Sequence, residues 1–224
     1  MKIIDITGPI YEGMWDFDFP GGQFKLNQLN YDFLGEDYFH EGFEGMVGST
    51  GTFLETGATY LGYEKSIPTD KMPLEKLVNI DACVLQTPYE TLNEKDGRKY
   101  ISLNDIKKAE KEGVTEGSAI IVSTGYGKNW DKKDYMEKSP FFKRDAFYHL
   151  LDRSPVLIAS DFPGWENVVN PENFLKRLYG SGVFVLVSCV NLETIKKYKV
   201  KLTALPIKVL NVCMCPCRAV VIEE

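Results

Sequence analysis

The sequence predicts a single α/β domain over residues 1–224, with helices packed outside a mixed or largely antiparallel sheet. Of the 224 residues, 44% are hydrophobic and 26% are charged, a composition typical of a globular chain with one core. Short apolar or alternating segments, which favour strands, occur along the whole chain, and helical patterns lie between them. No internal repeat and no long Pro-, Gly- or Ser-rich linker divides the chain.

Strand patterns are short and mostly bounded by Gly, Pro or Asp, as expected where a strand ends in a turn. The first sixty residues contain strand and loop patterns alone, whereas strands and helices mix at irregular spacing in the rest. A regular alternation of parallel strands and helices is therefore not expected. The predicted strands are residues 2–7, 24–33, 42–49, 82–87, 119–123, 156–160, 183–188 and 218–222.

Helices are predicted where apolar residues recur at three- and four-residue spacing. Ser102 and Asn170 are the expected N-caps of two helices, because their short polar side chains accept backbone hydrogen bonds at a helix start. Pro171 would occupy a first helical position, and Gly180 and Gly182 would end the last helix. The predicted helices are residues 73–78, 102–110, 144–152 and 170–179.

The charge balance argues against several classes of partner. The chain has 26 basic and 32 acidic residues, so we expect neither nucleic acid nor an anionic membrane surface to bind it. No glycine-rich phosphate-binding motif is present, and nucleotide binding is not expected. The N-terminus lacks a signal-peptide pattern, no apolar run reaches bilayer length, and the five cysteines are an odd number. We therefore expect a cytoplasmic protein with reduced thiols.

Histidine is scarce, and this limits the kinds of catalytic or metal-binding site that the chain can form. Only His40 and His149 are present, so the count excludes any site that needs several imidazoles. His149 lies in a predicted helix, and we expect it to be a structural histidine whose ring nitrogens have hydrogen-bond partners. His40 lies in an acidic, aromatic segment that is expected to be a solvated loop, although it is also a candidate pH-sensitive donor to a ligand.

Five motifs occur in order along most of the chain. They are Asp5-Ile6-Thr7-Gly8-Pro9-Ile10-Tyr11-Glu12-Gly13-Met14 with Phe19-Pro20-Gly21, then Ala119–Tyr126 with Trp130, Ile158–Asp161, Leu205–Lys208 and Pro216–Val220. In this order they resemble the bacterial cyclase family, whose best-known members are kynurenine formamidases and related metal-dependent hydrolases. The resemblance implies a hydrolase or cyclase that acts on a small amide, lactone or cyclic imide. It also implies a homodimer or homotetramer, with the extended stretch 1–33 as a segment that can exchange contacts between subunits.

The family holds zinc or manganese with the motif His-x-Gly-Thr-His-x-Asp-x-Pro-x-His, which is similar to residues 49–59 here. Gly51 and Thr52 match it, but the other positions have lost their imidazoles. A late helix and the following strand supply two further ligands in the family. The six positions that correspond to family ligands are Ser49, Phe53, Glu55, Thr59, Leu175 and Val187. One carboxylate cannot replace several imidazole donors, so we expect no metal cofactor.

Two functions remain open from these residues. In the first, the chain is a metal-independent enzyme in which Glu55 is the general acid or base. Hydrogen bonds to substrate would then come from Ser49, Thr52 and Thr59, and the apolar wall from Phe53 with Trp15. In the second, the chain is a catalytically inactive family member that binds a small molecule or a protein, and Glu55 is a structural carboxylate.

The cysteines are one group of residues that could still bind a metal ion in place of the missing histidines. Cys213, Cys215 and Cys217 alternate, so their thiols would face one side of an extended segment near the family's metal site. With Cys189 they could form a thiolate site that replaces the lost ligands. The favoured alternative is that these cysteines are small buried hydrophobic residues.

Overall fold

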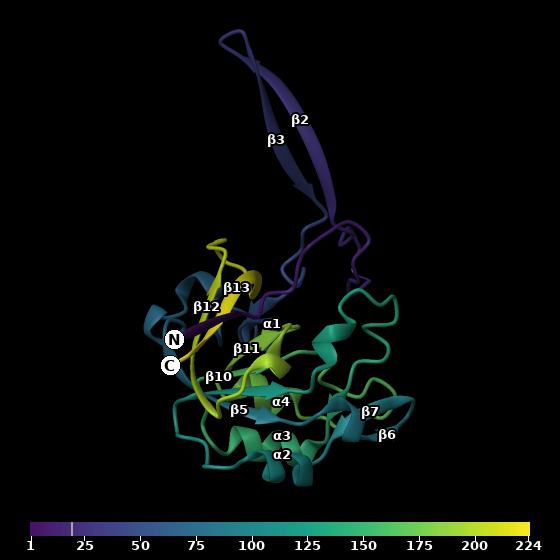
Figure 1. The fold of residues 1–224 in the computed structure, drawn as a ribbon, viewed down its shortest axis with the longest axis vertical. Helices are drawn as coiled ribbons and strands as arrows, with labels where there is room; N and C mark the ends of the chain where they lie inside the picture. The colour runs from purple at the N-terminus through teal and green to yellow at the C-terminus, as the bar shows by residue number, and fades with distance from the viewer. Residues whose placement is uncertain (19) are drawn as a thin grey trace.

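The computed structural model describes residues 1–18 and 20–224. Its main sheet has the strand order β1-β13-β12-β5-β8-β10-β11-β4, and β4 also pairs with β13. Seven of these strands therefore close into a barrel, with β1 added outside the ring along β13 (Figure 1). The strands are β1 (Lys2–Asp5), β4 (Phe53–Glu55), β5 (Ile80–Gln86), β8 (Ala119–Ser123), β10 (Leu157–Ser160), β11 (Phe184–Val187), β12 (Lys199–Pro206) and β13 (Met214–Glu223).

The sheet is mixed, as predicted, but its closure into a barrel was not predicted. Strands β5, β8, β10 and β11 run parallel to their neighbours in this group. The pairings that involve β1, β4, β12 and β13 are antiparallel. Closure depends on β4, which has only three residues and therefore carries too short a pattern to be recognised as a strand.

Two apolar clusters fill the two sides of the barrel wall. The first lies inside the barrel and includes Leu54, Ile121, Leu186 and Leu202. The second lies on the outer face of β5, β8, β10 and β11, where helices cover the wall. Figure 1 shows α2 (Leu103–Ala109) and α3 (Arg144–Leu151) packed together on this side. The remaining helices are α1 (Ala58–Leu61) and α4 (Leu175–Gly180).

The predicted helices are confirmed in part. Helix α2 begins after Ser102, whose side chain forms a capping box with Asp105, and α3 lies where it was predicted. The predicted N-cap at Asn170 is wrong, because α4 begins at Leu175 and the Asn170 side chain instead donates to Asp96 Oδ2 at 2.9 Å. Residues 73–78 contain only a 3₁₀ turn. The 3₁₀ turns are η1 (Thr69–Lys71), η2 (Leu74–Lys76), η3 (Tyr89–Thr91), η4 (Tyr126–Asn129) and η5 (Leu192–Thr194).

Five strands lie outside the main sheet. A small sheet is formed by β6 (Asn93–Lys95), β7 (Arg98–Ile101) and β9 (Phe141–Phe142). A long hairpin, β2 (Lys25–Phe33) with β3 (Glu36–Glu44), projects from the body (Figure 1). The prediction of a strand at 42–49 overlaps only the end of β3, and His40 lies in that strand rather than in a loop. Within the described residues, no helix is long and apolar enough to cross a membrane.

Asp161, which ends one of the five motifs, ties two strand ends together. It follows β10 and is completely buried. Its Oδ1 accepts from Thr124 Oγ1 at 2.7 Å, and its Oδ2 accepts from the backbone N–H of Gly125 at 2.6 Å. The backbone N–H of Thr124 also donates to this carboxylate. Burial raises the pKa of Asp161 to about 6, yet the carboxylate fixes the turn that follows β8.

We expect Asp161→Asn to destabilise the fold by about 2 kcal/mol or more, because one carboxylate oxygen is replaced by an amide group that faces buried donors. Urea unfolding followed by circular dichroism measures the loss. The control is Asp131→Asn, at an exposed position. Equal stabilities of the two variants at neutral pH would show that the carboxylate does not hold the turn.

Candidate functional site

A cavity of about 360 Å³ lies against the outer face of the barrel, between β4, β11, α4 and the segment 163–168. Most of its lining side chains are apolar or aromatic, which is usual for small-molecule sites. The lining residues are Phe17, Ser49, Phe53, Glu55, Thr59, Met136, Pro163, Gly164, Trp165, Glu166, Val168, Leu175, Leu178, Tyr179, Val185, Val187 and Met214.

Strand alternation explains why β4 contributes to this cavity. Leu54 points into the barrel core, so its neighbours Phe53 and Glu55 point outward. In the antiparallel register, Val187 lies opposite Phe53 and Val185 opposite Glu55, which places all four side chains on one face. Helix α4 then covers them with Leu175, Leu178 and Tyr179, which are spaced for a single helix face.

The structure brings together the six positions that the sequence analysis compares with the family's ligand positions. Four come from the segment 49–59, one from α4 and one from β11. Although Leu175 and Val187 are more than 100 residues from that segment, they line the same cavity. The six positions are Ser49, Phe53, Glu55, Thr59, Leu175 and Val187.

Two other predicted site residues do not line the cavity. Thr52 is buried, and its hydroxyl accepts from Gly8 N–H at 2.8 Å and donates to the carbonyl oxygen of Ser188 at 2.6 Å. This hydroxyl is thus engaged by the backbone, and we withdraw its predicted role as a substrate donor. Trp15 is buried behind Phe17, with a distance of 5.7 Å between the two rings. Phe19 of the Phe-Pro-Gly motif lies outside the described residues.

Glu55 is the central polar group of the cavity. Only 6% of the residue is exposed, and the Tyr179 hydroxyl donates to its Oε1 at 3.1 Å. Thr59 is a second side-chain hydrogen-bond partner. Burial raises the pKa of Glu55, because the charged carboxylate loses water, and the two hydrogen bonds offset this only in part. Glu55 is therefore more readily protonated than an exposed glutamate.

Glu166, a second acidic residue in the lining of the cavity, has a structural role. Glu166 Oε1 accepts from the backbone N–H groups of Asn167 and Glu172, and its Oε2 accepts from that of Asn173. Both oxygens of this carboxylate are therefore engaged in holding the loop that leads to α4.

Several residues of the site were missed by the sequence analysis. Tyr179 lies in the predicted last helix, but no local signal indicates that it contacts Glu55. Arg98 is buried without a carboxylate partner among the described residues, and its guanidinium donates to the carbonyl oxygens of Ser139, Gly164 and Glu166. It thereby fixes the cavity wall.

The donors present do not fit zinc or manganese. Among the six positions only Glu55 offers a carboxylate, and Ser49 and Thr59 offer neutral hydroxyls, which are weak ligands for these ions. Within the described residues, no group of three or more His, Cys, Asp or Glu side chains is arranged to hold a metal ion. Neither histidine lines the cavity. His149 contacts Glu110 at 2.9 Å, as expected for a structural histidine.

Three cysteines, Cys189, Cys215 and Cys217, lie on the other side of the barrel wall from Glu55. Cys215 is paired with Leu54, whose side chain points into the barrel, and Cys217 and Cys189 belong to the inner cluster. Burial raises the pKa of all three thiols. Metal binding requires thiolates, so this environment disfavours the replacement site.

We expect Glu55→Gln to gain stability relative to the wild type as pH rises. The folded-state pKa of Glu55 is raised, so its contribution to stability is greatest below its unfolded-state pKa and is lost as pH rises through the folded-state pKa. Glutamine does not titrate. The free energy of unfolding of Glu55→Gln minus that of the wild type, measured in urea from pH 4 upward, should therefore increase with pH. The same difference for the control Glu116→Gln, at an exposed position, should not show this increase. A constant difference for Glu55→Gln would contradict the raised pKa.

Comparisons with solved structures agree on the fold. Isatin hydrolase A from Labrenzia aggregata, bound to benzyl benzoate, is 18% identical with a TM-score of 0.82, and the match covers 100% of this chain and 94% of that one. Isatin hydrolase A from Ralstonia solanacearum is 14% identical with a TM-score of 0.80, over 100% and 92%. A "potential metal-dependent hydrolase with cyclase activity" is 21% identical with a TM-score of 0.76, over 100% and 99%.

Sequence comparison gives the family. No curated protein matches the chain. The family model described as "Putative cyclase" matches residues 4–167, which include the segment 49–59, the β8 motif and Asp161. Because this match covers well over half of the sequence, the chain belongs to the Cyclase family.

Proposed function

We propose that this protein is a hydrolase or cyclase that acts on a small, uncharged amide, lactone or cyclic imide without a divalent metal. The observation that carries the proposal is the convergence of the family's ligand positions on one apolar cavity with Glu55 at its centre. The similar isatin hydrolases support small-molecule chemistry in this fold.

The cavity favours an uncharged substrate. No Lys, Arg or His is among its lining residues, so the described part of the cavity offers no cation to a charged carboxylate or phosphate. Burying such an anion beside Glu55 without a partner would be strongly unfavourable. Phe17, Phe53 and Trp165 supply aromatic surface against which a planar ring can pack.

Glu55 would perform the proton transfers. In its ionised form it accepts a proton from water as the water oxygen forms a bond to the substrate carbonyl carbon. In its protonated form it then donates that proton to the nitrogen or oxygen of the bond that breaks, so the carboxylate is regenerated. Its raised pKa suits both steps, because the protonated form that donates in the second step is then more readily reached than in an exposed glutamate. Tyr179 and Thr59 orient the carboxylate through their hydrogen bonds.

A specific observation also favours a second function, that of a binding module without catalysis. The negative charge that develops on a carbonyl oxygen during hydrolysis needs strong donors or a cation. The polar groups that line the cavity beside Glu55 are mainly the neutral hydroxyls of Ser49, Thr59 and Tyr179. A cavity of this kind can bind an apolar molecule firmly and still accelerate its hydrolysis weakly.

A substrate screen separates the two functions. We expect purified protein to hydrolyse at least one member of a panel of uncharged compounds, namely isatin, lactones and cyclic imides, with a rate that is unchanged by a chelator. Glu55→Gln should lower kcat by about 10²-fold or more, as is typical for loss of a general acid or base, with the melting temperature within a few degrees of the wild type. Glu116→Gln is the matched control and should keep full activity.

Two outcomes would change the assignment. Turnover that survives in Glu55→Gln would remove Glu55 from the mechanism. If members of the panel raise the melting temperature but none is turned over, the binding module becomes the function that the cavity supports.

A further inference from the structure

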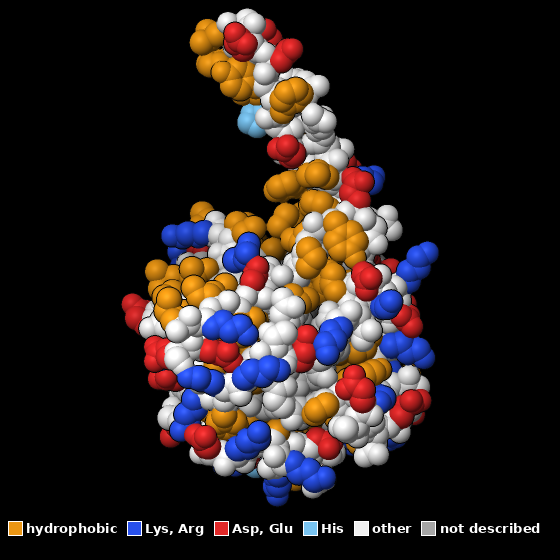
Figure 2. Space-filling view, in the orientation of Figure 1, with side chains coloured by type: hydrophobic (Ala, Val, Ile, Leu, Met, Phe, Trp, Pro, Cys, Tyr) orange, Lys and Arg blue, Asp and Glu red, His pale blue; other side chains and the backbone are white. Residues whose placement is uncertain are grey.

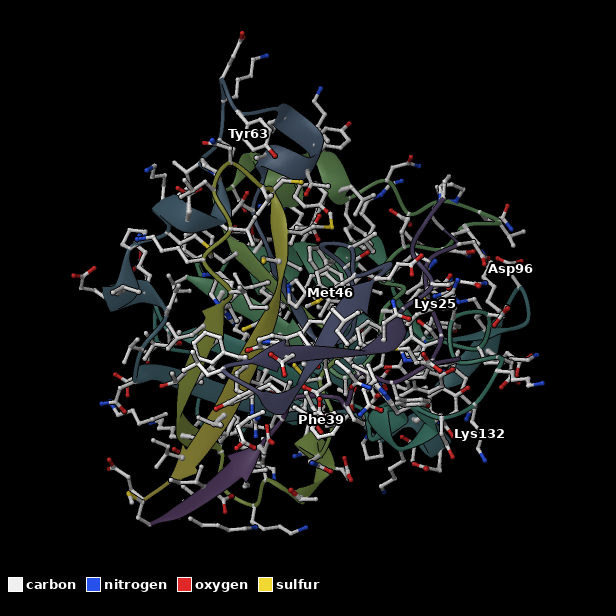
Figure 3. The ribbon with its side chains drawn as sticks, turned by 90° about the horizontal axis from the view of Figure 1, so that it is seen from above. Lys25, Phe39, Met46, Tyr63, Asp96 and Lys132 are labelled. Carbon is white, nitrogen blue, oxygen red and sulfur yellow. The ribbon has the colours of Figure 1, made fainter. Side chains whose placement is uncertain are left out.

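A second, smaller cavity, which we call the side cavity, lies where the hairpin β2–β3 joins the body. Its lining comes from the segment that leads into β2 and from the segment that follows β3. Lys25 and Glu44 are paired at the base of the hairpin, and this pairing brings the two segments together. Hydrophobic side chains gather at this junction (Figure 2). Seen from above, Lys25 at the start of β2 and Met46 just after β3 both lie over the body (Figure 3).

The side cavity shares a wall with the cavity around Glu55, because Phe17 and Ser49 line both of them. Trp15 and Thr50 also line the side cavity. Its volume is about 10 Å³, which is room for about one water molecule and for no larger ligand.

Trp15 has a buried indole N–H group without a protein partner. The residue is only 8% exposed, and its Nε1 makes no hydrogen bond to any described residue. The other two tryptophans are paired, since Trp130 Nε1 donates to Pro9 O at 3.0 Å and Trp165 Nε1 donates to Ser160 Oγ at 2.6 Å. Buried polar groups are nearly always bonded to protein or to ordered water. The Trp15 N–H group therefore calls for an acceptor other than the described protein groups.

Neighbouring rings hold the Trp15 side chain in place. The distances between ring centres are 4.9 Å to Trp130, 4.9 Å to Tyr135 and 5.7 Å to Phe17. The indole cannot turn toward a protein acceptor without disrupting these contacts, because protein interiors are closely packed. A small acceptor has to come to the indole instead.

The side cavity also offers the other partners that a buried water needs, which number two to four in all. Ser49 is 5% exposed, and its hydroxyl can both donate and accept. Thr50 Oγ1 accepts from the backbone N–H of Val47 at 2.9 Å, so its hydroxyl proton can be donated to a water. With Trp15, three polar side chains therefore line a space of the size of one water.

We infer that the side cavity holds one water molecule, which accepts a hydrogen bond from Trp15 Nε1 and donates one to a carbonyl oxygen of the molecule bound beside Glu55. Ser49 stands in the wall between the two cavities and binds the same water. Trp15 is then a positioning residue, because it acts on the bound molecule through the water.

The contribution of this water to catalysis rests on the proposed function. The carbonyl oxygen gains negative charge during hydrolysis and needs hydrogen-bond donors. A water that accepts from an N–H group is polarised by it and donates more strongly in turn. It remains bound throughout and is distinct from the water that attacks the carbonyl carbon. It thus supplies a donor that the hydroxyls lining the cavity around Glu55 do not supply alone.

Crystal structures of the wild type and of Trp15→Phe test the water site without reference to activity. Phenylalanine keeps an aromatic ring in the cluster but removes the N–H group. We expect one ordered water at about 3 Å from Trp15 Nε1 in the wild type, and we expect this water to be lost or disordered in the variant. A wild-type structure without this water would overturn the inference. A water that is equally well ordered at the same place in Trp15→Phe would overturn it too.

Kinetics with a compound that the substrate screen identifies tests the role of the water. Trp15→Phe should lower kcat by about 10-fold, which is less than for loss of a direct donor to the oxyanion. Its KM should stay within about two-fold of the wild type, because the hydrogen bond strengthens as charge develops in the transition state. The matched control is Trp130→Phe, which removes the donor to Pro9 O and should lower the melting temperature but keep kcat. Full kcat in Trp15→Phe would show that the water does not serve the reaction.

Failure of the proposed function would be recognised separately. If no compound of the panel is turned over, the crystal structures still decide whether the water is bound to Trp15. Its link to the neighbouring cavity is then measured by binding of isatin, an uncharged compound with carbonyl oxygens. Isatin should raise the melting temperature of the wild type more than that of Trp15→Phe, and equal shifts would refute the link.

Discussion

The whole structure depends on the pairing of one three-residue strand, β4, with β11 on one side and β13 on the other. This strand closes the barrel, so its neighbours have no open edge. Leu54 points inward and is completely buried in the barrel core. Phe53 and Glu55 point outward into the cavity. Barrel closure and site geometry are therefore set by the same three residues.

The family motifs divide into those that hold the fold and those that the sequence analysis compares with metal-ligand positions. The residues that hold the fold include Thr52, Asp161 and Trp130. Thr52 bonds to Gly8 and Ser188, and Trp130 Nε1 donates to Pro9 O at 3.0 Å. A Cβ on Gly8 would lie 2.2 Å from the Trp130 ring, which explains the glycine there.

The positions of the second kind lie together in the structure, and most of them carry apolar or uncharged side chains. The cavity is lined by Phe53, Leu175 and Val187. Apolar side chains there stabilise the core by removing their surface from water. They also leave Glu55 in surroundings of low polarity, which raise its pKa. The electrostatic character of the site therefore follows from the apolar side chains around Glu55.

Local signals in the sequence predicted some parts of this structure. The strand β8 and the helix that begins after Ser102 were located correctly, because apolar runs and capping residues act over a few positions. The start of α4 was misplaced, since the polar Asn170 is satisfied by Asp96, far away in sequence. Strand β12 was missed, although Val200, Leu202 and Ala204 alternate on its buried face.

Residues of the site were predicted only where they belong to a motif that resembles the family. The segment 49–59 pointed to Glu55, and the resemblance pointed to Leu175 and Val187. The hydrogen bond from Tyr179 to Glu55 joins residues 124 positions apart. Arg98 on β7 likewise joins two segments that are distant in sequence, 139–140 and 164–166. Closure of the barrel by β4 likewise depends on strands that lie more than 100 residues away in sequence. Such contacts are properties of the fold, and no short pattern encodes them.

The central claim is that this member of the Cyclase family retains the fold without the family's metal centre. Elemental analysis of protein purified without added metal tests it most directly. The donor set predicts less than about 0.1 equivalent of zinc or manganese per chain, since metal affinity scales with the number and type of deprotonated donors. A full equivalent that is lost in Glu55→Gln would contradict the claim, and one lost in Cys215→Ser would show that thiolates rebuilt the site.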